Sequence, residues 1–220
     1  MKIEKQAPES STRPGPSARI AVETLGCKVN QYETSYLLEL LKQAGYRIVP
    51  FREIADIYIV HSCAVTAKAG FQTRQLLRRA RRANPDALIV AAGCYAQLEA
   101  DRIAEEKLAT HILGNPGKFD LLEWLTRQAS FDNPCLAVHR EHRSCPEFEI
   151  LPVTRTHTGR TRAMLKIQDG CDSFCSYCVV PHVRGRSRSL PGDRVLAQLH
   201  QLVAEGYREI VLTGIHLGKW

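Results

Sequence analysis

The chain has 220 residues, of which 44% are hydrophobic and 24% are charged, a composition typical of a folded protein with one or two domains. Its 30 Lys and Arg residues outnumber 23 Asp and Glu residues, and the formal net charge of +7 favours a polyanionic partner. The longest apolar stretch, residues 87–96, has about half of the roughly 18 residues that a membrane-spanning helix needs. The sequence therefore excludes a transmembrane helix, and no membrane partner is expected.

Residues 1–18 are predicted to form a flexible leader, because they combine Pro, Ser and mixed charges without the apolar run of a secretory signal. A chain without an export signal is expected in the cytoplasm, which is a reducing compartment. Eight cysteines in such a chain are more often metal ligands or catalytic groups than disulfides.

Residues 19–129 are predicted to form an open parallel α/β sheet with flanking helices, because short apolar runs alternate with helical patterns. The expected strands are residues 20–24, 57–60, 88–92 and 111–113. A helix is expected to begin at Asn30, which would act as N-cap with Glu33 three residues on, and to end at Gly45. The same Asn30 could also orient a ligand at the rim of a metal site.

A second helix is predicted over residues 67–83, and the Asn84-Pro85 pair is expected to end it. This segment carries six cations and no acidic residue: Lys68, Arg74, Arg78, Arg79, Arg81 and Arg82. Two interpretations stay open, a solvated outer face or a face that binds phosphates.

Residues 130–160 resemble a linker, since periodicity fades there and prolines recur. In residues 161–220 a strand at 163–167, a helix at 194–204 and a strand at 209–213 predict one βαβ unit. The sequence stops seven residues after the last of these strands. A single crossover has no complete sheet to join, so we expect the chain to be a fragment of a longer protein.

Three cysteines lie close together in the loop that follows the strand at 163–167. Cys171, Cys175 and Cys178 form a C-x3-C-x2-C pattern. Three thiolates on one loop fit a [4Fe-4S] cluster whose fourth iron is open to a small molecule. The alternative is a structural zinc with His182 as fourth ligand.

Three further cysteines follow predicted strands. Cys27, Cys63 and Cys94 each follow a predicted strand within three residues and lie close to a glycine or another small residue. Since the carboxyl ends of parallel strands share one edge of the sheet, a second metal site with three cysteines is predicted there. The competing interpretation is that each is a small buried hydrophobic residue. Cys135 and Cys145 show no pattern and are interpreted as ordinary thiols.

Clusters of cations flank the Cys171 loop on both sides, in residues 155–162 and at Arg184, Arg186 and Arg188. They would hold a phosphate backbone, or they are simply solvated. The histidines are assigned no role beyond surface or core polar residues; they include His61, His139, His142, His157 and His216.

The cysteine motifs together resemble the radical S-adenosylmethionine methylthiotransferases, and in particular the tRNA branch that acts on N6-threonylcarbamoyladenosine. The resemblance rests on LGCKVNQYET, CAVT, AAGCYAQ, LKIQDGCDSFCSYCVVPHVRGRSRS and LTGIHLG, and it covers nearly all of residues 19–218. It implies an N-terminal sheet domain followed by the first βαβ unit of a radical S-adenosylmethionine partial barrel.

The resemblance also implies two [4Fe-4S] clusters. Cys27, Cys63 and Cys94 would hold an auxiliary cluster, and Cys171, Cys175 and Cys178 would hold the cluster that binds S-adenosylmethionine. Tyr177 would lie against the adenine of that cofactor. No residue is assigned as a catalytic acid or base.

The implied reaction is the cleavage of S-adenosylmethionine to a radical and the transfer of a methylthio group to the modified adenine beside a tRNA anticodon. The implied partner is the tRNA anticodon arm, docked partly through Arg74, Arg78 and Arg81 and through the loops around Arg160 and Arg186. The protein is expected to be a monomer, with an electron donor and a sulfur source that the sequence does not identify. His61-Ser62 departs from the Asn-Thr usual in the family. The resemblance also leads us to expect that this chain lacks the family's later radical-domain units and C-terminal RNA-binding barrel.

Two other functions remain open at this stage. One is a zinc-binding, non-catalytic RNA-binding module built on Cys171, Cys175, Cys178 and His182. The other is a methylthiotransferase that acts on isopentenyladenosine in tRNA or on a ribosomal protein.

Overall fold

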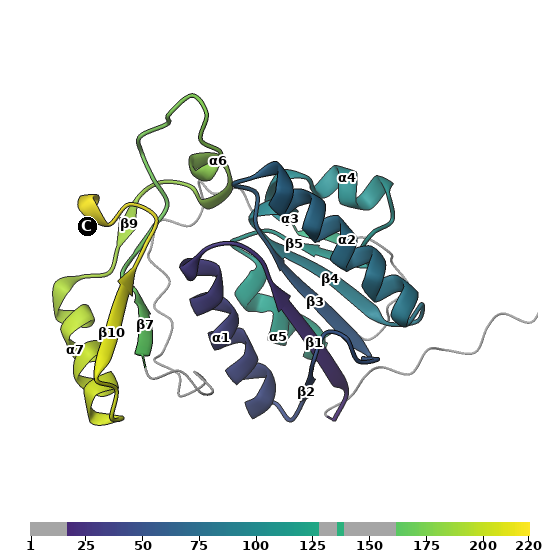
Figure 1. Ribbon diagram of the computed structural model, residues 1–220, viewed down its shortest axis with the longest axis horizontal. Coiled ribbons are helices and arrows are strands. Elements are labelled where there is room, and N and C mark those ends of the chain that lie inside the picture. Colours follow the sequence, from purple (N-terminus) through teal and green to yellow (C-terminus); the bar gives the residue numbers. More distant parts are fainter. Residues whose placement is uncertain (1–16, 128–135, 139–161) are drawn as a thin grey trace, which may run out of the picture.

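The computed structural model describes residues 17–127, 136–138 and 162–220, and it places a sheet with helices on both faces beside a smaller α/β unit (Figure 1). The strands of the large sheet are β1 Arg19–Thr24, β2 Arg47–Val49, β3 Ile57–Ser62, β4 Leu88–Gly93, β5 His111–Leu113 and β6 Leu136–Val138. The helices of this part are α1 Lys28–Gln43, α2 Ala67–Ala83, α3 Cys94–Leu98, α4 Ala100–Glu105, the 3₁₀ helix η1 Lys118–Asp120 and α5 Leu121–Arg127.

The large sheet is parallel throughout, with the strand order β2-β1-β3-β4-β5-β6. The chain first adds β2 on one side of β1 and then returns to add β3 on the other side. The direction of winding therefore changes between β1 and β3. In open parallel sheets, a crevice forms at the carboxyl ends of the strands beside such a change, which marks this edge as the place for a ligand.

The residues of the strands alternate between two cores, as both faces of a covered parallel sheet require. Tyr58 and Val60 of β3 pack with Leu77 of α2, on the face that α3 and α4 also cover. Ile57 and Ile59 point the other way and pack in the core that contains residues of α1 and α5. The sheet is thereby fixed from both sides, and its carboxyl edge is held rigidly.

The second part begins at β7 and contains a crossover between two parallel strands. Its elements are β7 Arg162–Lys166, β8 Gln168–Asp169, α6 Val180–Arg184, β9 Arg188–Ser189, α7 Gly192–Ala204, β10 Glu209–Thr213 and the 3₁₀ helix η3 Leu217–Lys219. β7 pairs with β10 in parallel, and α7 packs on the pair through a small apolar core. β8 and β9 form a short antiparallel pair on either side of the loop with three cysteines. The predicted βαβ unit is confirmed.

The predicted α/β class, the four predicted strands of the large sheet and the helix over 67–83 are confirmed. Two expectations are wrong. Helix α1 starts at Lys28 with Cys27 as its N-cap residue, so Asn30 is not the cap. Residues 136–138, inside the expected linker, form the edge strand β6. The rest of that linker and residues 1–16 of the leader lie outside the described residues.

The short strand β2 was not anticipated. Within the described parts of the chain, the search for a helix long and apolar enough to span a bilayer found none.

Candidate functional site

Three cysteines lie at the carboxyl ends of neighbouring strands. Cys27 is the N-cap residue of α1 after β1, Cys63 follows β3 directly, and Cys94 is the first residue of α3 after β4. The strands β1, β3 and β4 are adjacent in the sheet, and the register pairs Ser62 with Gly93, the residues just before Cys63 and Cys94. The sheet therefore brings the three predicted residues to one edge, beside the change of winding (Figure 1).

The backbone at Gly26 packs directly against Cys63. Gly26 has a φ of +99°, and a Cβ at this position would stand 2.6 Å from both Cβ and Sγ of Cys63. Burial raises the pKa of the Cys63 thiol, the backbone N–H of Val65 opposes this, and the Cys94 and Cys27 thiols raise the pKa further. The three thiols therefore interact electrostatically in the folded chain.

Asn115 connects Cys94 to the second part of the chain. Its Nδ2 atom donates to Sγ of Cys94 at 3.3 Å and to the carbonyl oxygen of Val183 in α6 at 2.6 Å. Its Oδ1 atom accepts from Nζ of Lys118 at 3.1 Å. The side chain is buried, so its orientation is fixed by these three contacts. One amide hydrogen of Asn115 thus points at a sulfur that the sequence predicts to be a ligand.

Asn30 is fully buried inside the first turn of α1 and joins two loops of the sheet edge. Its Nδ2 atom donates to the carbonyl oxygens of Leu25 at 2.9 Å and Ser62 at 3.0 Å. Its Oδ1 atom lies 3.8 Å from Sγ of Cys27 and accepts from Arg184 at 2.6 Å. Asn30 is therefore not a helix cap, but it does contact a candidate ligand.

The second set of cysteines lies in the loop between β8 and α6. Cys175 is exposed, and Cys171 and Cys178 are half-buried. The backbone N–H of Cys178 donates to the carbonyl of Cys175 at 2.9 Å, which closes a turn. Hydrogen bonds from the backbone and hydroxyl of Ser173, and then from His216, lower the pKa of the Cys171 thiol to about 7. Cys171 is thus partly thiolate at neutral pH, which is the form that binds metals.

Gln168 fixes the base of this loop to the chain after β10. Its Nε2 atom donates to the carbonyl of Gly170 at 2.8 Å and to the hydroxyl of Ser187 at 3.1 Å. Its Oε1 atom accepts from the backbone N–H groups of Ile215 at 2.8 Å and His216 at 2.7 Å. The side chain is fully buried, so the loop with the three cysteines starts from a rigid base.

The two other residues predicted around this loop are both exposed. Tyr177, the candidate adenine contact, is 89% exposed. His182, the fourth ligand of the alternative zinc site, is also exposed, and its ring lies 6.0 Å from that of Phe174.

Six cysteines of the described residues are free thiols. Among these residues, no three His, Cys, Asp or Glu side chains already stand in a metal-binding arrangement. The chemistry of both sets still fits an iron–sulfur cluster, because soft thiolates are its usual ligands and the thiols are unpaired. Cys135 and Cys145 lie outside the described residues.

A buried cluster of charges lies between the two parts of the chain. The carboxylate of Glu33 is fully buried and pairs with Lys118 at 2.7 Å, Lys166 at 2.9 Å and Arg184 at 3.1 Å. Asp169 pairs with Lys166 at 2.9 Å and with Arg184 at 2.9 Å. We call these five residues the interdomain charge cluster. Glu33 and Lys118 belong to the first part, and the other three belong to the second part.

The cluster keeps its acids ionised despite burial. Burial alone would raise the pKa of Glu33, but Arg184, Lys118 and Lys166 outweigh it and hold that pKa well below its usual value. Burial likewise opposes ionisation of Asp169, and Arg184 and Lys166 lower its pKa. The pKa values of the two lysines shift in opposite directions. The pKa of Lys166 is raised to about 12, whereas burial lowers the pKa of Lys118.

His61 lies at the edge of this cluster and is neutral. Burial, and then the charge of Lys118, lower its pKa to about 3, although Glu33 works in the opposite direction. Its Nδ1 atom is 2.8 Å from the hydroxyl of Thr34, and its Nε2 atom is 3.6 Å from the carboxylate of Glu33. We regard this last contact as one between a neutral ring and an anion. The expectation that His61 is a core polar residue is confirmed.

The three arginines that follow the cysteine loop differ in how far they are exposed to solvent. Arg184 is only 2% exposed, so the interpretation that it holds phosphates or is solvated is wrong. Arg188 is largely buried and donates to the carbonyl of Arg184 at 2.8 Å. Arg186 remains on the surface, 3.6 Å from Asp172. Residues 155–161 lie outside the described residues.

The sequence analysis did not predict most of the interdomain charge cluster. It also did not predict the hydrogen bonds that the side-chain amides of Asn115 and Gln168 make beside the two sets of cysteines. The only available signal was position, since Lys166, Gln168 and Asp169 directly precede the loop with Cys171. Nothing in the sequence indicated that Asn115 would contact Cys94. His216, left without a role, lies 3.8 Å from Sγ of Cys171.

Comparison with known proteins first defines the class of the sheet domain. Residues 19–114 match the model of a family described as uncharacterized protein family UPF0004. The match runs from the first residue of β1 to just beyond β5, so it contains all three strands that end at Cys27, Cys63 and Cys94. This part of the chain is therefore similar to the UPF0004 family over most of the large sheet.

The relatives then define the kind of protein. The chain is 41% identical over 203 residues to the threonylcarbamoyladenosine tRNA methylthiotransferase of Bacillus subtilis (strain 168), covering 92% of this chain and 45% of the relative. It is 36% identical over 203 residues to the protein of the same name from Aquifex aeolicus (strain VF5), covering 92% and 49%. It is 30% identical over 216 residues to a tRNA-2-methylthio-N(6)-dimethylallyladenosine synthase of Paracoccus denitrificans (strain Pd 1222), covering 96% and 47%.

The chain spans about half the length of the curated relatives it matches. The resemblance to methylthiotransferases that the motifs indicated is confirmed over most of this chain. Two of these relatives are named as tRNA methylthiotransferases and the third as a synthase of a 2-methylthio adenosine derivative in tRNA, and the two names specify different modified adenosines.

Proposed function

We propose that this chain is the two-cluster portion of a tRNA methylthiotransferase that acts on N6-threonylcarbamoyladenosine beside the anticodon. The observation that carries the proposal is the presence of two separate sets of three free cysteines on rigid supports. One set lies at the carboxyl edge of the sheet, and the other lies on the loop that Gln168 braces. The tRNA anticodon arm is the proposed partner, and the protein is proposed to act as a cytoplasmic monomer.

Cys27, Cys63 and Cys94 would hold the auxiliary [4Fe-4S] cluster, and Cys171, Cys175 and Cys178 would hold the cluster to which S-adenosylmethionine binds. When bound, these groups supply a carbon radical and the sulfur for transfer. Tyr177 would cover the adenine of S-adenosylmethionine.

The residues around the cysteines have distinct tasks in this proposal. Asn115 donates a hydrogen bond to Cys94, which stabilises negative charge on that sulfur. Hydrogen bonds from Ser173 and His216 favour the thiolate of Cys171. The interdomain charge cluster fixes α1 against β7 and α6, and so keeps the two sets of cysteines in one orientation.

The choice of substrate rests on the relatives. Five relatives named for threonylcarbamoyladenosine range from 31% to 41% identity, and four of them reach 35% or more, whereas three named for dimethylallyladenosine stand at 30–31%. Nucleoside analysis of tRNA from a strain that lacks the gene tests this branch. We expect loss of the 2-methylthio derivative of N6-threonylcarbamoyladenosine; loss of a methylthiolated isopentenyladenosine instead would contradict the proposal.

The first test is metal content after anaerobic preparation of the 220-residue chain. We expect about eight irons and eight labile sulfides per chain, with a broad absorption band in the visible region. Cys94→Ala and Cys175→Ala should each lower the iron content to about four. In a full-length version of the protein, because this chain alone is not expected to complete the reaction, Cys175→Ala should abolish cleavage of S-adenosylmethionine, which Cys94→Ala should leave intact. A colourless chain that holds about one zinc would instead support the zinc-binding RNA module.

A further inference from the structure

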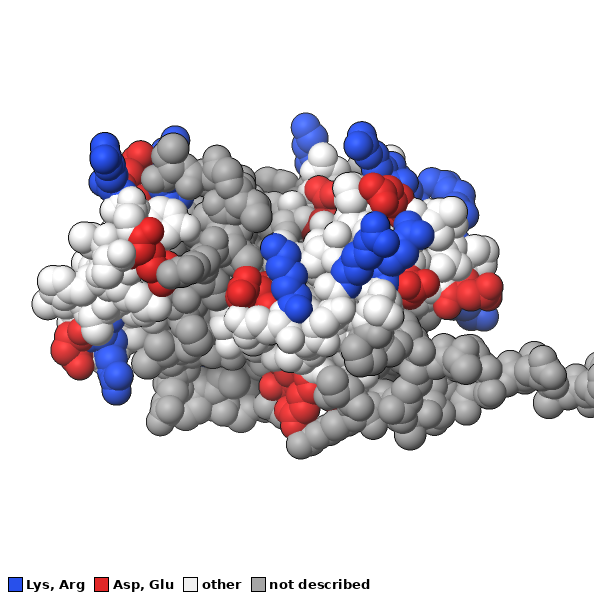
Figure 2. Space-filling model, turned by 90° about the horizontal axis from the view of Figure 1, so that it is seen from below, with Lys and Arg blue, Asp and Glu red and all other residues white. Residues whose placement is uncertain are grey.

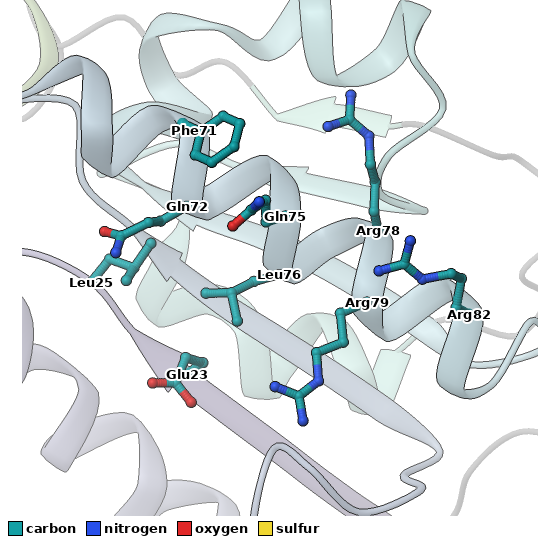
Figure 3. A pocket seen from close by; sticks show the side chains of 9 residues that line it. All are labelled: Glu23, Leu25, Phe71, Gln72, Gln75, Leu76, Arg78, Arg79 and Arg82. Carbon is teal, nitrogen blue, oxygen red and sulfur yellow. The ribbon is translucent and has the colours of Figure 1, made fainter.

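A groove runs along the exposed side of α2 and over the end of β1. It encloses about 590 Å³, and its sides are formed by Glu23, Leu25 and a row of α2 side chains from Phe71 to Arg82 (Figure 3). Leu25 stands two residues before Cys27, so one end of the groove lies close to the edge of the sheet that carries the three cysteines. The groove is separate from the interdomain charge cluster.

The arginines of α2 fall into two groups. The side chains in the first group have partners in the protein: Arg74 donates to the Tyr95 hydroxyl, Arg78 pairs with Glu106 at 2.6 Å, and Arg81 donates to the Pro85 carbonyl at 3.2 Å. This group contains the three arginines that the sequence singled out for docking RNA, and their engagement argues against that choice.

Arg79 and Arg82 form the second group. Both are exposed, both line the groove, and neither has an ion pair or side-chain hydrogen bond within the described residues. Figure 3 shows Arg79 extending from α2 toward the strand that carries Glu23, with Leu76 beside it. Figure 2 shows that Lys and Arg side chains gather, with acidic ones among them, over the part of the molecule that holds the large sheet. Arg79 and Arg82 are thus the two arginines of this groove that are free to bind an external anion within the described residues.

An exposed aromatic ring lies on the same side of α2. Phe71 is 51% exposed, and Gln72 and Gln75 of the groove lie one and four residues further along. From Phe71 to Arg82 the helix rises by about 16 Å, which is enough for several nucleotides of a strand stacked at about 3.4 Å each. An aromatic platform beside free arginines is the combination that binds single-stranded nucleic acid, by stacking a base and holding phosphates.

We propose that this groove binds a single-stranded segment of the RNA substrate. Phe71 stacks on a base, while Arg79 and Arg82 hold phosphates of the adjoining backbone. The carboxylate of Glu23 repels phosphate from the β1 side and leaves an acceptor for base amino groups, so the backbone follows α2. The inference rests on the proposed function, because it locates part of the RNA on which that function depends.

The test measures the affinity of the whole chain for a fluorescent RNA hairpin with an anticodon-type single-stranded loop, at several salt concentrations. The variant is Arg79→Gln/Arg82→Gln. The matched control is Lys42→Gln/Arg47→Gln, which removes the same charge from exposed positions at the end of α1 and in β2. A third variant, Phe71→Ala, removes the stacking platform alone.

We expect the double arginine variant to weaken binding by about tenfold or more and to lower the salt dependence by about two counterions. The control should change affinity by less than about threefold. Phe71→Ala should weaken binding by about fivefold or more while leaving the salt dependence unchanged, since stacking releases no counterions.

Two outcomes would overturn the inference: an arginine variant that behaves like the control, or a wild-type chain that does not bind the hairpin. Iron and sulfide contents of the same preparations are measured separately. If the preparations contain both clusters and the variants bind RNA as the wild type does, the inference that the groove binds RNA is wrong, whereas the proposed function is not contradicted. Missing clusters would count against the proposed function, whatever the RNA result.

Discussion

Glu33 is the carboxylate that joins the two parts of the chain within the interdomain charge cluster. It is fully buried and stands within 3.1 Å of three cations, two of which come from the other part of the chain. The free-energy cost of removing these charges from water is offset by their mutual attraction only while every member of the cluster is present. The effect of losing one partner should therefore be large and specific to that position.

Glu33→Gln should lower the free energy of unfolding by about 3 kcal/mol or more, because it leaves the cations with Asp169 as the remaining carboxylate of the cluster. Urea unfolding at neutral pH measures this loss. The matched control is Glu39→Gln on the same helix, because the Glu39 side chain is half-buried and its carboxylate accepts a hydrogen bond from Gln43 at 3.0 Å. The control should lose less than about 0.5 kcal/mol. Equal losses in both variants would show that the cluster contributes nothing beyond a surface charge.

Asn115 offers a second test at the level of a single atom. An N–H donated to a ligand sulfur stabilises the more negative, reduced form of a cluster and so raises its reduction potential. Asn115→Ala should therefore lower the potential of the auxiliary cluster in a redox titration followed by electron paramagnetic resonance. The cluster at the Cys171 loop serves as internal control and should keep its potential. A shift of both potentials together would point to a general disturbance.

The residue scale is also where sequence reasoning was weakest. The two sets of cysteines could be predicted from their spacing and from their positions after strands. Arg184 was grouped with solvated or phosphate-binding arginines, because its partners Glu33 and Asn30 lie 151 and 154 residues away in the chain. A local pattern contains no information about such contacts. Asn30 and Glu33 likewise have the spacing of a capping pair, yet both are buried polar groups of the interface.

At the scale of elements, glycine sets how closely the loops of the sheet edge approach one another. Gly26→Ala would place a Cβ 2.6 Å from Cβ and Sγ of Cys63 and would also strain a φ of +99°. Gly206→Ala is the matched control, because Gly206 has a φ of +91° and nothing within 4 Å of the added atom. Both variants pay a similar backbone cost of about 1 kcal/mol.

We expect Gly26→Ala to destabilise the chain by at least about 1 kcal/mol more than Gly206→Ala, as measured by urea unfolding. It should also lower the iron content after reconstitution, since Cys63 must move. If the two variants were equally stable and equally loaded with iron, the loop at Gly26 would not be in contact with Cys63 in solution.

The elements themselves were largely predictable, and the exceptions have physical reasons. The bounds of α2 agree with the prediction, because Thr66 accepts from Ala69 as N-cap and the Asn84-Pro85 pair stops the helix. By contrast, α1 begins two residues before Asn30, at Lys28, and its N-cap residue Cys27 makes no side-chain cap. β2 and β6 have three residues each and depend on pairing with a neighbouring strand, which a local pattern cannot reveal.

At the scale of the whole molecule, buried histidines make stability depend on pH. Burial lowers the pKa of His111 to about 4, and that of His61 to about 3 with help from Lys118. The unfolded chain binds these protons below about pH 6.5, whereas the folded chain does not. The contribution of each histidine is therefore complete above about pH 6.5 and declines as the pH falls toward the folded value. The lowered pKa values of Glu33 and Asp169 add a further loss, which begins only below about pH 4.

Unfolding free energies measured between pH 7 and pH 4.5 should accordingly fall, by up to ~1.4 kcal/mol per pH unit for each histidine. His111→Gln should make this slope shallower by up to one proton, whatever its effect on stability at neutral pH. His200→Gln, at an exposed position of α7, should leave the slope unchanged. An identical slope in the wild type and in His111→Gln would mean that His111 titrates normally in the folded chain.

The division of the interdomain charge cluster between the two parts limits how this protein can be recombined with its relatives. The second part contributes two cations and one carboxylate, and the first part contributes one of each. A chimera that joined residues 162–220 to a foreign sheet domain with no acid at the place of Glu33 would bury Lys166 and Arg184 against Asp169 alone. Exchanges of domains among such proteins should therefore succeed only when the acid of α1 and the cations of β7 and α6 are inherited together.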